Sequence, residues 1–347
     1  MSDQRPSDKG DKNPPTAPLR VQYEQARADF ERNMEQARVQ FEKTVEQGRA
    51  QLERNVEQAR AQFENVQNRI NKRTGRNLLG AIVMGFILGG GIIASLIIDK
   101  RYFMLAAIAL LGVASFELAT AMRHRQWYVP RYLSTAVTVL VVPITYVYGL
   151  PIGIVAMLGG LAVIFLWLLI RLSWKHAIPG ATIATSFAAS AFAQGYVTLF
   201  GAFTVALVSS NNGQWWTLAF LIVVVSVDIG AYASGMLFGK HLLAPKISPK
   251  KTWEGFAGAG VLACIAGVLV TWLMLHEVWW TGLILGIVLL FVATWGDLGE
   301  SYLKRVIGIK DMSTWLAGHG GYLDRIDSIL PSGVVVYIIY LVVQGSH

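Results

Sequence analysis

The sequence predicts an all-α polytopic membrane protein with about nine transmembrane helices and an N-terminal cytoplasmic helix built on an eleven-residue repeat. Three observations predict this fold class. Hydrophobic residues make up 54% of the 347 residues and charged residues 15%, against roughly 25% charged in a typical soluble domain. Apolar runs long enough to cross a bilayer follow one another after residue 76. Half of the Lys and Arg residues, 15 of 30, precede that point.

The first 76 residues divide into a tail and an arm. Residues 1–19 are rich in Pro, Asp and Lys and have almost nothing to bury, which predicts disorder. From 20 to 72, apolar positions such as Phe30, Phe41, Leu52 and Phe63 recur every eleven residues. Eleven residues in three turns give a nearly straight helix with one apolar stripe. Small stripe residues and balanced charges favour a coiled coil that forms a homo-oligomer; an amphipathic helix on the membrane surface is the alternative.

Residues 77–345 form the predicted membrane body. Its apolar runs lie near 77–98, 102–122, 132–149, 151–171, 184–208, 215–238, 252–275, 278–295 and 332–344. With nine spans, one set of alternate loops carries thirteen Lys and Arg residues, whereas the other carries only Lys100 and Arg101. Because positively charged loops stay in the cytoplasm, we expect the N-terminus, the arm and the basic loops to be cytoplasmic.

Acidic residues are scarce in the membrane body, yet five of its ten fall between 297 and 327. Helical spacing puts Asp297, Glu300, Ser301 and Lys304 on one face, and repeats at Asp324, Asp327 and Ser328 at the start of the final helix. Carboxylates gathered in one site repel one another unless a cation lies between them, and oxygen ligands suit Mg²⁺. The segment therefore predicts a metal site for phosphoryl or nucleotidyl transfer. A purely structural cluster of salt bridges is the alternative.

Two acidic residues lie inside other predicted helices. Asp228 falls within the sixth, where ionisable groups are costly and usually functional, and it shares a face with Tyr232 and two glycines. The alternative is a glycine packing seam around a buried acid. Glu117, near the inner end of the second helix, is interpreted as a buried structural partner instead of a catalytic group.

The loop before the seventh predicted helix is basic. Ser248 is a plausible N-cap and Pro249 suits the first helical position. Free backbone N–H groups would then lie beside Lys250 and Lys251, which is a ready site for phosphate. An ordinary basic anchor at the membrane surface is the alternative.

These motifs resemble the signature of the phosphatidate cytidylyltransferase (CDP-diacylglycerol synthase) family. The signature runs through Ser301-x-x-Lys304-Arg305, Lys310-Asp311 and His319-Gly-Gly-x-x-Asp324-Arg325-x-Asp327. Other family elements are similar to Asp228-x-x-Ala-Tyr232, Phe238-Gly-Lys-His241 and Ser248-Pro-Lys-Lys-Thr252. The resemblance covers roughly 220–335 with motifs, and it does not include the arm.

The resemblance implies a nucleotidyltransferase that transfers CMP from CTP to phosphatidate, giving CDP-diacylglycerol and pyrophosphate for phospholipid biosynthesis. It implies Mg²⁺ as cofactor and leaves a second, monovalent cation open. The expected partners are CTP, phosphatidate and the lipid bilayer, with no nucleic acid. The expected location is a bacterial-type inner membrane with a cytoplasmic active site.

The resemblance also implies residue roles. Asp297 and Asp324 match the principal metal ligands, within a catalytic group of Asp297, Lys304, Asp311, Asp324 and Asp327. Substrate-binding candidates are Asp228, Tyr232, Ser248, Lys250, Lys251, Thr252, Ser301, Arg305, Lys310, His319 and Arg325. No protein nucleophile is needed, because a phosphomonoester with a second pKa of about 6 is already largely anionic at neutral pH. His319, between glycines, is interpreted as fixing the loop, and as a proton acceptor in the alternative.

Other functions stay open from the sequence. A CTP-dependent lipid kinase, or a cytidylyltransferase for another lipid acceptor, would keep the fold and change the chemistry. A transporter would account for Asp228, but transporters place their sites in broken, repeat-related helices near the midplane, and no repeat is visible. A scaffold built around the arm leaves the acidic cluster unexplained.

Overall fold

The computed structural model describes residues 89–173, 182–313 and 320–345, together with eight single positions of the arm between 24 and 51. The chain divides into two compact units, residues 1–78 and 79–347. The described arm positions are helical. The rest of the predicted tail and eleven-residue repeat lies outside the described residues, and so does His319.

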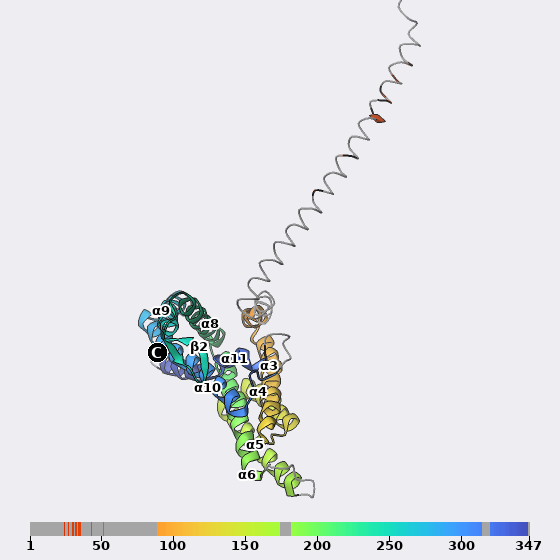
Figure 1. Cartoon of the computed structure of the whole chain (residues 1–347), viewed down its shortest axis with the longest axis vertical. Coiled ribbons are helices and arrows are strands. Elements are labelled where there is room, and N and C mark those ends of the chain that lie inside the picture. Colours follow the sequence, from red (N-terminus) through yellow and green to blue (C-terminus); the bar gives the residue numbers. More distant parts are fainter. Residues whose placement is uncertain are drawn as a thin grey trace, which may run out of the picture. The chain divides into compact units, whose positions relative to one another are not determined.

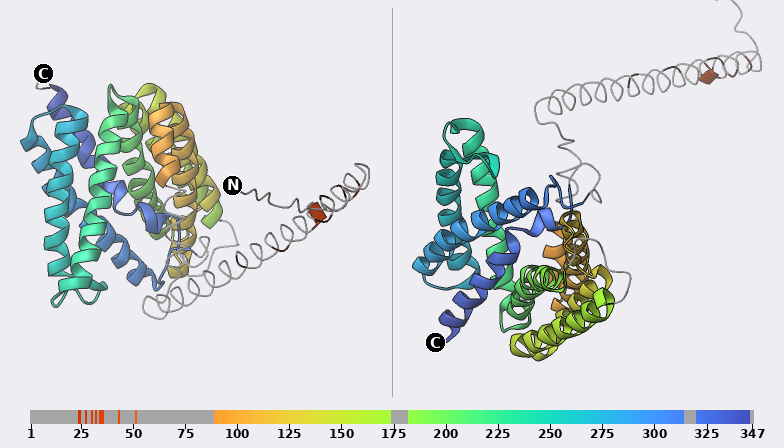
Figure 2. Two further views of the ribbon diagram at one scale, coloured as in Figure 1. Left: turned by 90° about the horizontal axis from the view of Figure 1, so that it is seen from above. Right: turned by 60° about the horizontal axis from the view of Figure 1, so that its bottom comes forward.

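Eight helical spans in the described residues are long and apolar enough to cross a membrane (Figures 1 and 2). They are Lys100–Arg125, Arg131–Tyr148, Leu150–Arg171, Ile183–Ser209, Gly213–Phe238, Trp253–Leu275, Trp279–Ile307 and Leu323–Gly345. The first predicted span, 77–98, is described only from Gly89, where a shorter apolar helix runs to Ile98. The all-α polytopic class is therefore confirmed, and the ninth span stays a prediction.

The first half of the bundle consists of consecutive helices. They are α3 (Lys100–Ala121), the 3₁₀ turn η1 (Met122–Arg125), α4 (Arg131–Tyr148), α5 (Leu150–Ser173), α6 (Ile183–Ala193), the π-helical turn η2 (Gln194–Leu199) and α7 (Phe200–Ser209). The buried Gln194 side chain donates to the Ser134 carbonyl at 3.0 Å and accepts from Thr198 Oγ1 at 2.7 Å. Because buried polar groups need partners, the bond to Ser134 holds η2 against α4.

The second half carries the polar motifs. It consists of α8 (Gly213–Phe238), β1 (Leu242–Ala244), β2 (Ser248–Thr252), α9 (Trp253–Val270), the π-helical turn η3 (Thr271–Leu275), α10 (Trp279–Ile307), α11 (Leu323–Ile326) and α12 (Ile329–Gly345). Helix α9 packs between α8 and α10, and α12 joins the halves by packing on α7 and α10. A Cβ atom at Gly267 would overlap the Gly282 carbonyl, so glycine lets α9 and α10 touch, as small residues do between membrane helices.

Two span boundaries differ from the predictions. The span expected at 278–295 continues as α10 to Ile307, and the helix ends only at Gly308, which has φ of 86°. The final span begins nine residues before the expected position 332, at Leu323 in α11. Hydropathy alone misses both extensions, because charged side chains interrupt the apolar run without interrupting the helix.

The predicted helix start at Ser248 is wrong. Ser248 and Thr252 are the ends of strand β2, which pairs antiparallel with β1 through Ala244 and Leu242. Thr252 is the N-cap of α9, since its side-chain oxygen accepts from the Gly255 amide at 3.1 Å. A proline in an edge strand needs no ladder donor, which makes the strand compatible with Pro249.

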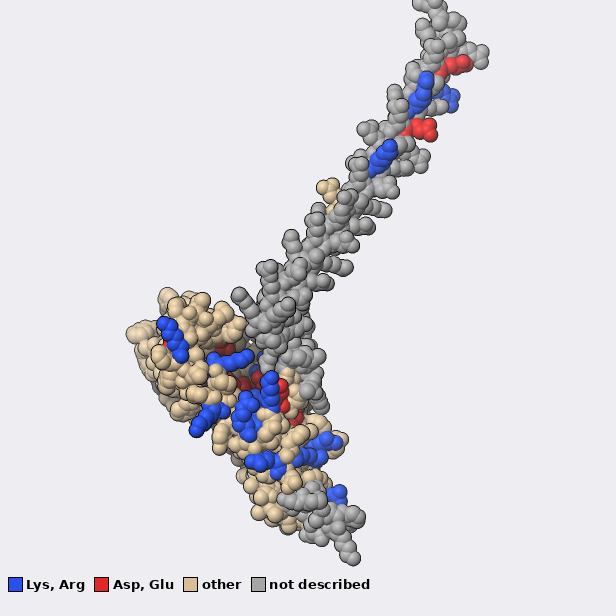
Figure 3. All heavy atoms as spheres, viewed as in Figure 1, with Lys and Arg blue, Asp and Glu red and all other residues tan. Residues whose placement is uncertain are grey.

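Lys and Arg side chains gather on the face of the membrane body seen in Figure 3, where acidic side chains lie in a recess between them. Lys100 and Arg101, the two basic residues predicted for the opposite loops, have other partners. Lys100 donates to the Ser210 carbonyl at 2.7 Å, and Arg101 lies 3.9 Å from the Asp99 carboxylate. The basic motif residues and the carboxylates therefore meet on one face.

Candidate functional site

A polar pocket lies between α8, the β-hairpin, α9 and α10. Its polar lining residues are Asp228, Tyr232, Lys250, Lys251, Thr252, Thr294 and Asp297. Six of these seven were substrate-binding or metal-binding candidates from the sequence, and they come from three separate elements, α8, β2 and α10. The Asp228 side chain is open to this pocket. The structure therefore brings together three motifs that the sequence separates.

The β-hairpin that carries the lysines is fastened to the first turn of α9. The Glu254 carboxylate accepts hydrogen bonds from the backbone amides of Lys240 at 3.1 Å and His241 at 3.2 Å, and it contacts His241 Nδ1 at 2.6 Å. A charged acceptor shared by several donors forms strong hydrogen bonds. Glu254 therefore fixes the entry to the hairpin, and the hairpin holds Lys250 and Lys251 beside the pocket.

Asp297 and Lys251 form an ion pair across the pocket, with 2.5 Å between Oδ2 and Nζ. The Lys251 side chain is 25% exposed and the Asp297 side chain 35% exposed, so solvent reaches both partners. Asp228 lies within electrostatic reach of both of them. An accessible pair of this kind exchanges partners easily, because exposed ion pairs contribute little net stability.

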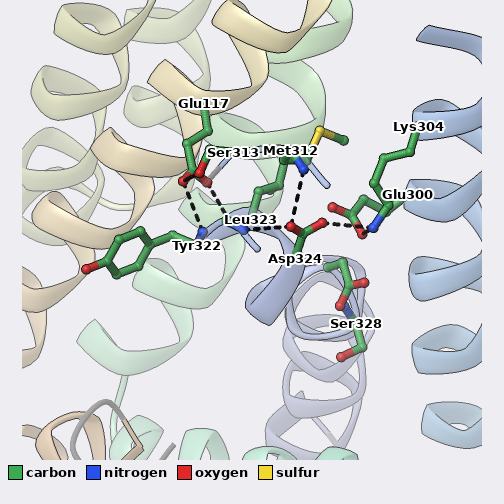
Figure 4. A network of polar contacts seen from close by, with 11 residues as sticks. Glu117, Glu300, Lys304, Met312, Ser313, Tyr322, Leu323, Asp324 and Ser328 are labelled. Atoms are coloured by element: carbon green, nitrogen blue, oxygen red, sulfur yellow. Dashed lines mark hydrogen bonds and ion pairs between the residues drawn. The ribbon is translucent and has the colours of Figure 1, made fainter. Parts of the chain in front are cut away.

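Asp324 lies in a much more enclosed network (Figure 4). Its Oδ1 accepts from Lys304 Nζ at 2.8 Å, and its Oδ2 accepts from the backbone amides of Gly321 at 2.7 Å and Met312 at 3.3 Å. Lys304 also contacts Glu300 Oε2 at 2.8 Å. The side chains of Lys304, Glu300 and Asp324 are 14%, 0% and 11% exposed. This part of the site is therefore held in place before any substrate binds.

Glu117 of α3 extends this network and is 2% exposed (Figure 4). It accepts from Ser313 Oγ at 2.5 Å and from the backbone amides of Tyr322 at 3.1 Å and Leu323 at 2.9 Å. These bonds tie α3 to both described ends of the segment that precedes α11. The interpretation of Glu117 as a buried structural partner is confirmed, and its partner is the motif loop.

Gly296 allows α10 to approach the junction of α11 and α12. A Cβ atom at this position would lie 2.6 Å from the Asp327 carbonyl oxygen and 3.2 Å from the Ser328 Cα. The buried Asp327 carboxylate accepts from the Ser328 amide at 2.7 Å and lies within electrostatic reach of Asp297. The close contact at Gly296 therefore brings together the aspartates of two helices.

The remaining candidates surround these clusters. On α10, Ser301 is half-buried and Arg305 exposed; Lys310 and Arg325 are exposed, and Asp311 is half-buried. A Cβ atom at Gly320, which has φ of 79°, would lie 3.7 Å from Asp311 Oδ1, so Asp311 is near the Asp324 loop. His319 lies outside the described residues.

The single face predicted for Asp297, Glu300 and Lys304 is divided in the structure. Asp297 lines the polar pocket, whereas Glu300 is buried beside Lys304 and lines a different cavity. Side chains three residues apart on a helix point about 60° away from each other. Members of one stripe can therefore face different partners. The sequence placed Glu300 on the face of the predicted metal site but gave it no individual role, although its i, i+4 spacing from Lys304 was a visible signal.

The donors of the site fit a magnesium ion in their chemistry. Within the described parts of the chain, no three His, Cys, Asp or Glu side chains are grouped as a metal would require. However, the Lys251 ammonium group contacts the Asp297 carboxylate. A positive charge is therefore favoured at this position. The Glu300 carboxyl group also lies within hydrogen-bond reach of the carboxyl groups of Asp324 and Asp327. Carboxylate oxygens are the ligands that Mg²⁺ prefers.

The fold and the site together define a class: helical multi-pass membrane proteins in which carboxylates and lysines form a phosphate-handling site at one end of the bundle. The chain belongs to the cytidylyltransferase family, whose model matches residues 80–343. It is therefore a member of a family of nucleotidyltransferases, and the resemblance seen in its motifs is confirmed. The match starts after the arm.

Several similar proteins carry the name phosphatidate cytidylyltransferase. The protein of Mycobacterium leprae (strain TN) is 35% identical over 275 residues, which cover 76% of this chain and 88% of the relative. That of Mycobacterium bovis is 36% identical over 278 residues, with 77% and 89% covered. That of Brucella suis biovar 1 is 42% identical over 123 residues, with 35% and 46% covered. The two mycobacterial matches extend over most of both chains.

Proposed function

We propose that this protein is a phosphatidate cytidylyltransferase, which transfers CMP from CTP to phosphatidate and releases pyrophosphate. The observation that carries the proposal is the polar pocket, in which Lys250 and Lys251 of β2 face Asp297 of α10 in a chain of this family. The relatives' name supplies the lipid acceptor.

The lysines and the start of α9 bind the triphosphate of CTP. Lys250 and Lys251 supply two ammonium groups directly before the N-terminus of α9, whose cap is Thr252. The positive end of the helix dipole favours an anion at this position. When the triphosphate binds, Lys251 moves from Asp297 to a phosphate oxygen, because their ion pair is accessible.

Asp297 and Asp324 would hold Mg²⁺, with Asp327 and Asp311 next to them. When bound, the ion supplies neutralisation of phosphate charge and fixes the orientation of the reacting groups. Lys304, paired with Glu300 and Asp324, orients the Asp324 carboxylate. A second, monovalent cation belongs to the same proposal, and the many carboxylates of the segment support it.

The chain provides positioning instead of a covalent intermediate. A phosphate oxygen of phosphatidate attacks the α-phosphorus of CTP, a new P–O bond forms, and the bond from the α-phosphorus to the bridging oxygen of pyrophosphate breaks. The attacking oxygen is already anionic, so no strong base is required. In-line phosphoryl chemistry of this kind depends mainly on orientation and charge stabilisation.

The orientation in the membrane follows from charge. Basic residues gather on the face that carries the site, and positively charged loops remain in the cytoplasm. We therefore place the site, the N-terminus and the arm on the cytoplasmic side of a bacterial-type inner membrane. The arm serves self-association into a homo-oligomer, which its eleven-residue repeat supports.

The test uses purified full-length protein, Mg²⁺ and phosphatidate with CTP labelled at either the α- or the γ-phosphate. Transfer of the α-label to lipid with release of pyrophosphate is the expected result. Transfer of the γ-label to lipid would instead identify a CTP-dependent lipid kinase and overturn the proposal.

A further inference from the structure

A second cavity lies on the other side of α10 from the polar pocket. We call it the apolar groove; its walls include Met122, Trp127, Phe192, Leu303 and Val306. It encloses about 1250 Å³, against about 740 Å³ for the polar pocket, counting in both cases the space open to the outside. The two cavities share α10, so one helix separates a charged compartment from an apolar one.

The helical period explains this separation. The polar pocket is lined from α10 by Thr294 and Asp297, whereas the apolar groove is lined by Gly299, Leu303 and Val306. At 100° per residue, the two sets lie on roughly opposite faces of the helix. The Asp324 network is reached from α10 as well, through Lys304. A substrate in the groove and a nucleotide in the pocket would therefore meet at the same helix.

The groove has a polar inner wall. Glu300, which binds Lys304, lines it, and so does Tyr196 of η2. Tyr196 Oη is buried and has no hydrogen-bond partner among the described residues. Polar atoms in this position are costly unless a ligand or water satisfies them. The groove thus suits a molecule that is mostly apolar and has polar groups along a short stretch of its length.

The outer end of the groove is basic. Arg125 of η1 is exposed, and its Nε donates at 2.9 Å to the carbonyl of Val306, a residue that lines the groove. Trp127 lies at the same end, and tryptophan is enriched where a membrane meets water. From Val306 to Gly299 the helix advances about 10 Å, which is a large part of one bilayer leaflet.

We propose that the apolar groove binds the acyl chains of an anionic phospholipid substrate, with the lipid phosphate at the end near Arg125. The identification of this lipid as phosphatidate rests on the proposed function. The chains extend along α6 and α10 towards Phe192, and the lipid enters sideways from the bilayer. Charge complementarity separates this occupant from a neutral membrane lipid, because the outer end of the groove is positive.

Gly299 gives direct access to the groove. A Cβ atom there meets nothing within 4 Å, so Gly299→Phe fills the groove without forcing the helix apart. Gly159 of α5 is an exposed helical glycine with the same open surroundings and no part in the groove, so Gly159→Phe is the matched control.

The experiment measures photolabelling of full-length protein in nanodiscs by phosphatidate that carries a diazirine in one acyl chain, without CTP. We expect label in residues 183–196 and 299–306, a loss of about tenfold in Gly299→Phe, and no change in Gly159→Phe. A tenfold loss corresponds to about two methylene groups displaced from an apolar site. In turnover, the KM for dioleoyl phosphatidate should rise about tenfold while the KM for CTP stays unchanged.

Two outcomes would overturn the groove assignment. One is equal labelling by diazirine phosphatidylcholine, which indicates bulk lipid; the other is unchanged labelling in Gly299→Phe. A wild-type protein that binds phosphatidate in the groove but forms no CDP-diacylglycerol would contradict the proposed function alone, so the two proposals fail separately.

Discussion

The carboxylates Asp297 and Asp324 carry the same predicted role but lie in different surroundings. Asp297 contacts one partner, Lys251, and both side chains are partly exposed beside the polar pocket. Asp324 contacts Lys304 and two backbone amides, and its side chain is 11% exposed. The difference indicates a division of labour: the Asp297 region is built to exchange partners, and the Asp324 region is built to stay fixed.

Neutralising each aspartate in turn is the most direct test of this difference between the two regions. We expect Asp297→Asn and Asp324→Asn each to lower kcat by about a hundred- to a thousandfold, the loss typical when charge stabilisation is removed from a transition state. Only Asp324→Asn should also lower the free energy of unfolding, by about 3 kcal/mol, because it breaks a buried ion pair.

The ion pair between Asp297 and Lys251 is partly exposed, and it contributes about 1 kcal/mol or less to the free energy of unfolding. Turnover of labelled CTP and thermal unfolding in detergent measure the two effects. Near-normal rates in either variant would remove that residue from the metal site, and equal stability losses would remove the distinction between the two regions.

Glu117→Gln tests whether the fixed region depends on α3. An amide in place of the carboxylate turns one acceptor into a donor facing the bonds from Ser313, Tyr322 and Leu323. We expect about 1–3 kcal/mol less stability and about tenfold lower kcat, with an unchanged KM for CTP. A raised KM for CTP with normal stability would indicate that Glu117 acts on the nucleotide instead.

Lysine substitutions test whether the Asp297 region exchanges partners when CTP binds. Lys251→Ala should raise the KM for CTP about tenfold, the value of one charge-assisted hydrogen bond, and raise the KM for lipid less. Lys250→Ala should have a smaller effect of about threefold, because Lys250 is exposed and pairs with no aspartate among the described residues. Steady-state kinetics with each substrate varied in turn make the measurement. A larger effect on the lipid KM would place the lysines at the lipid phosphate.

Removing residues 1–70 should have the smallest effect. Both regions belong to the unit 79–347, and the family match starts at residue 80. We expect kcat in detergent within about twofold of the full-length value, since none of the site's described contacts involves the removed segment. A folded but inactive truncation, judged by its thermal unfolding, would show that the arm takes part in catalysis.

The sequence was sufficient for the fold class and for most of the polar pocket. Apolar length predicted each of the eight described spans to within a few residues at one end or both, and the carboxylate motifs of α10 and α11 were recognisable without a structure. Local patterns of this kind depend on residues close together in the chain, and helical geometry then determines what shares a face.

What the sequence left out depends on contacts between distant segments. The pairing of Lys251 with Asp297 and the three bonds of Glu117 join residues far apart in the chain, and no periodicity predicts them. The strand at Ser248 was missed because Ser-Pro is also a common helix start, and its pairing with β1 decides between the two. The apolar groove was invisible because its wall residues read as ordinary membrane-spanning positions.

The close contact at Gly296 has a mechanical consequence. Helices in a bilayer change their tilt when the thickness of the hydrocarbon layer changes. Since α10 meets the α11–α12 junction backbone to backbone, such a tilt should carry Asp297 and Asp327 along together. An enzyme of this kind makes precursors of the membrane that surrounds it. Its reaction geometry would then be shielded from the changes in lipid composition that its own product causes.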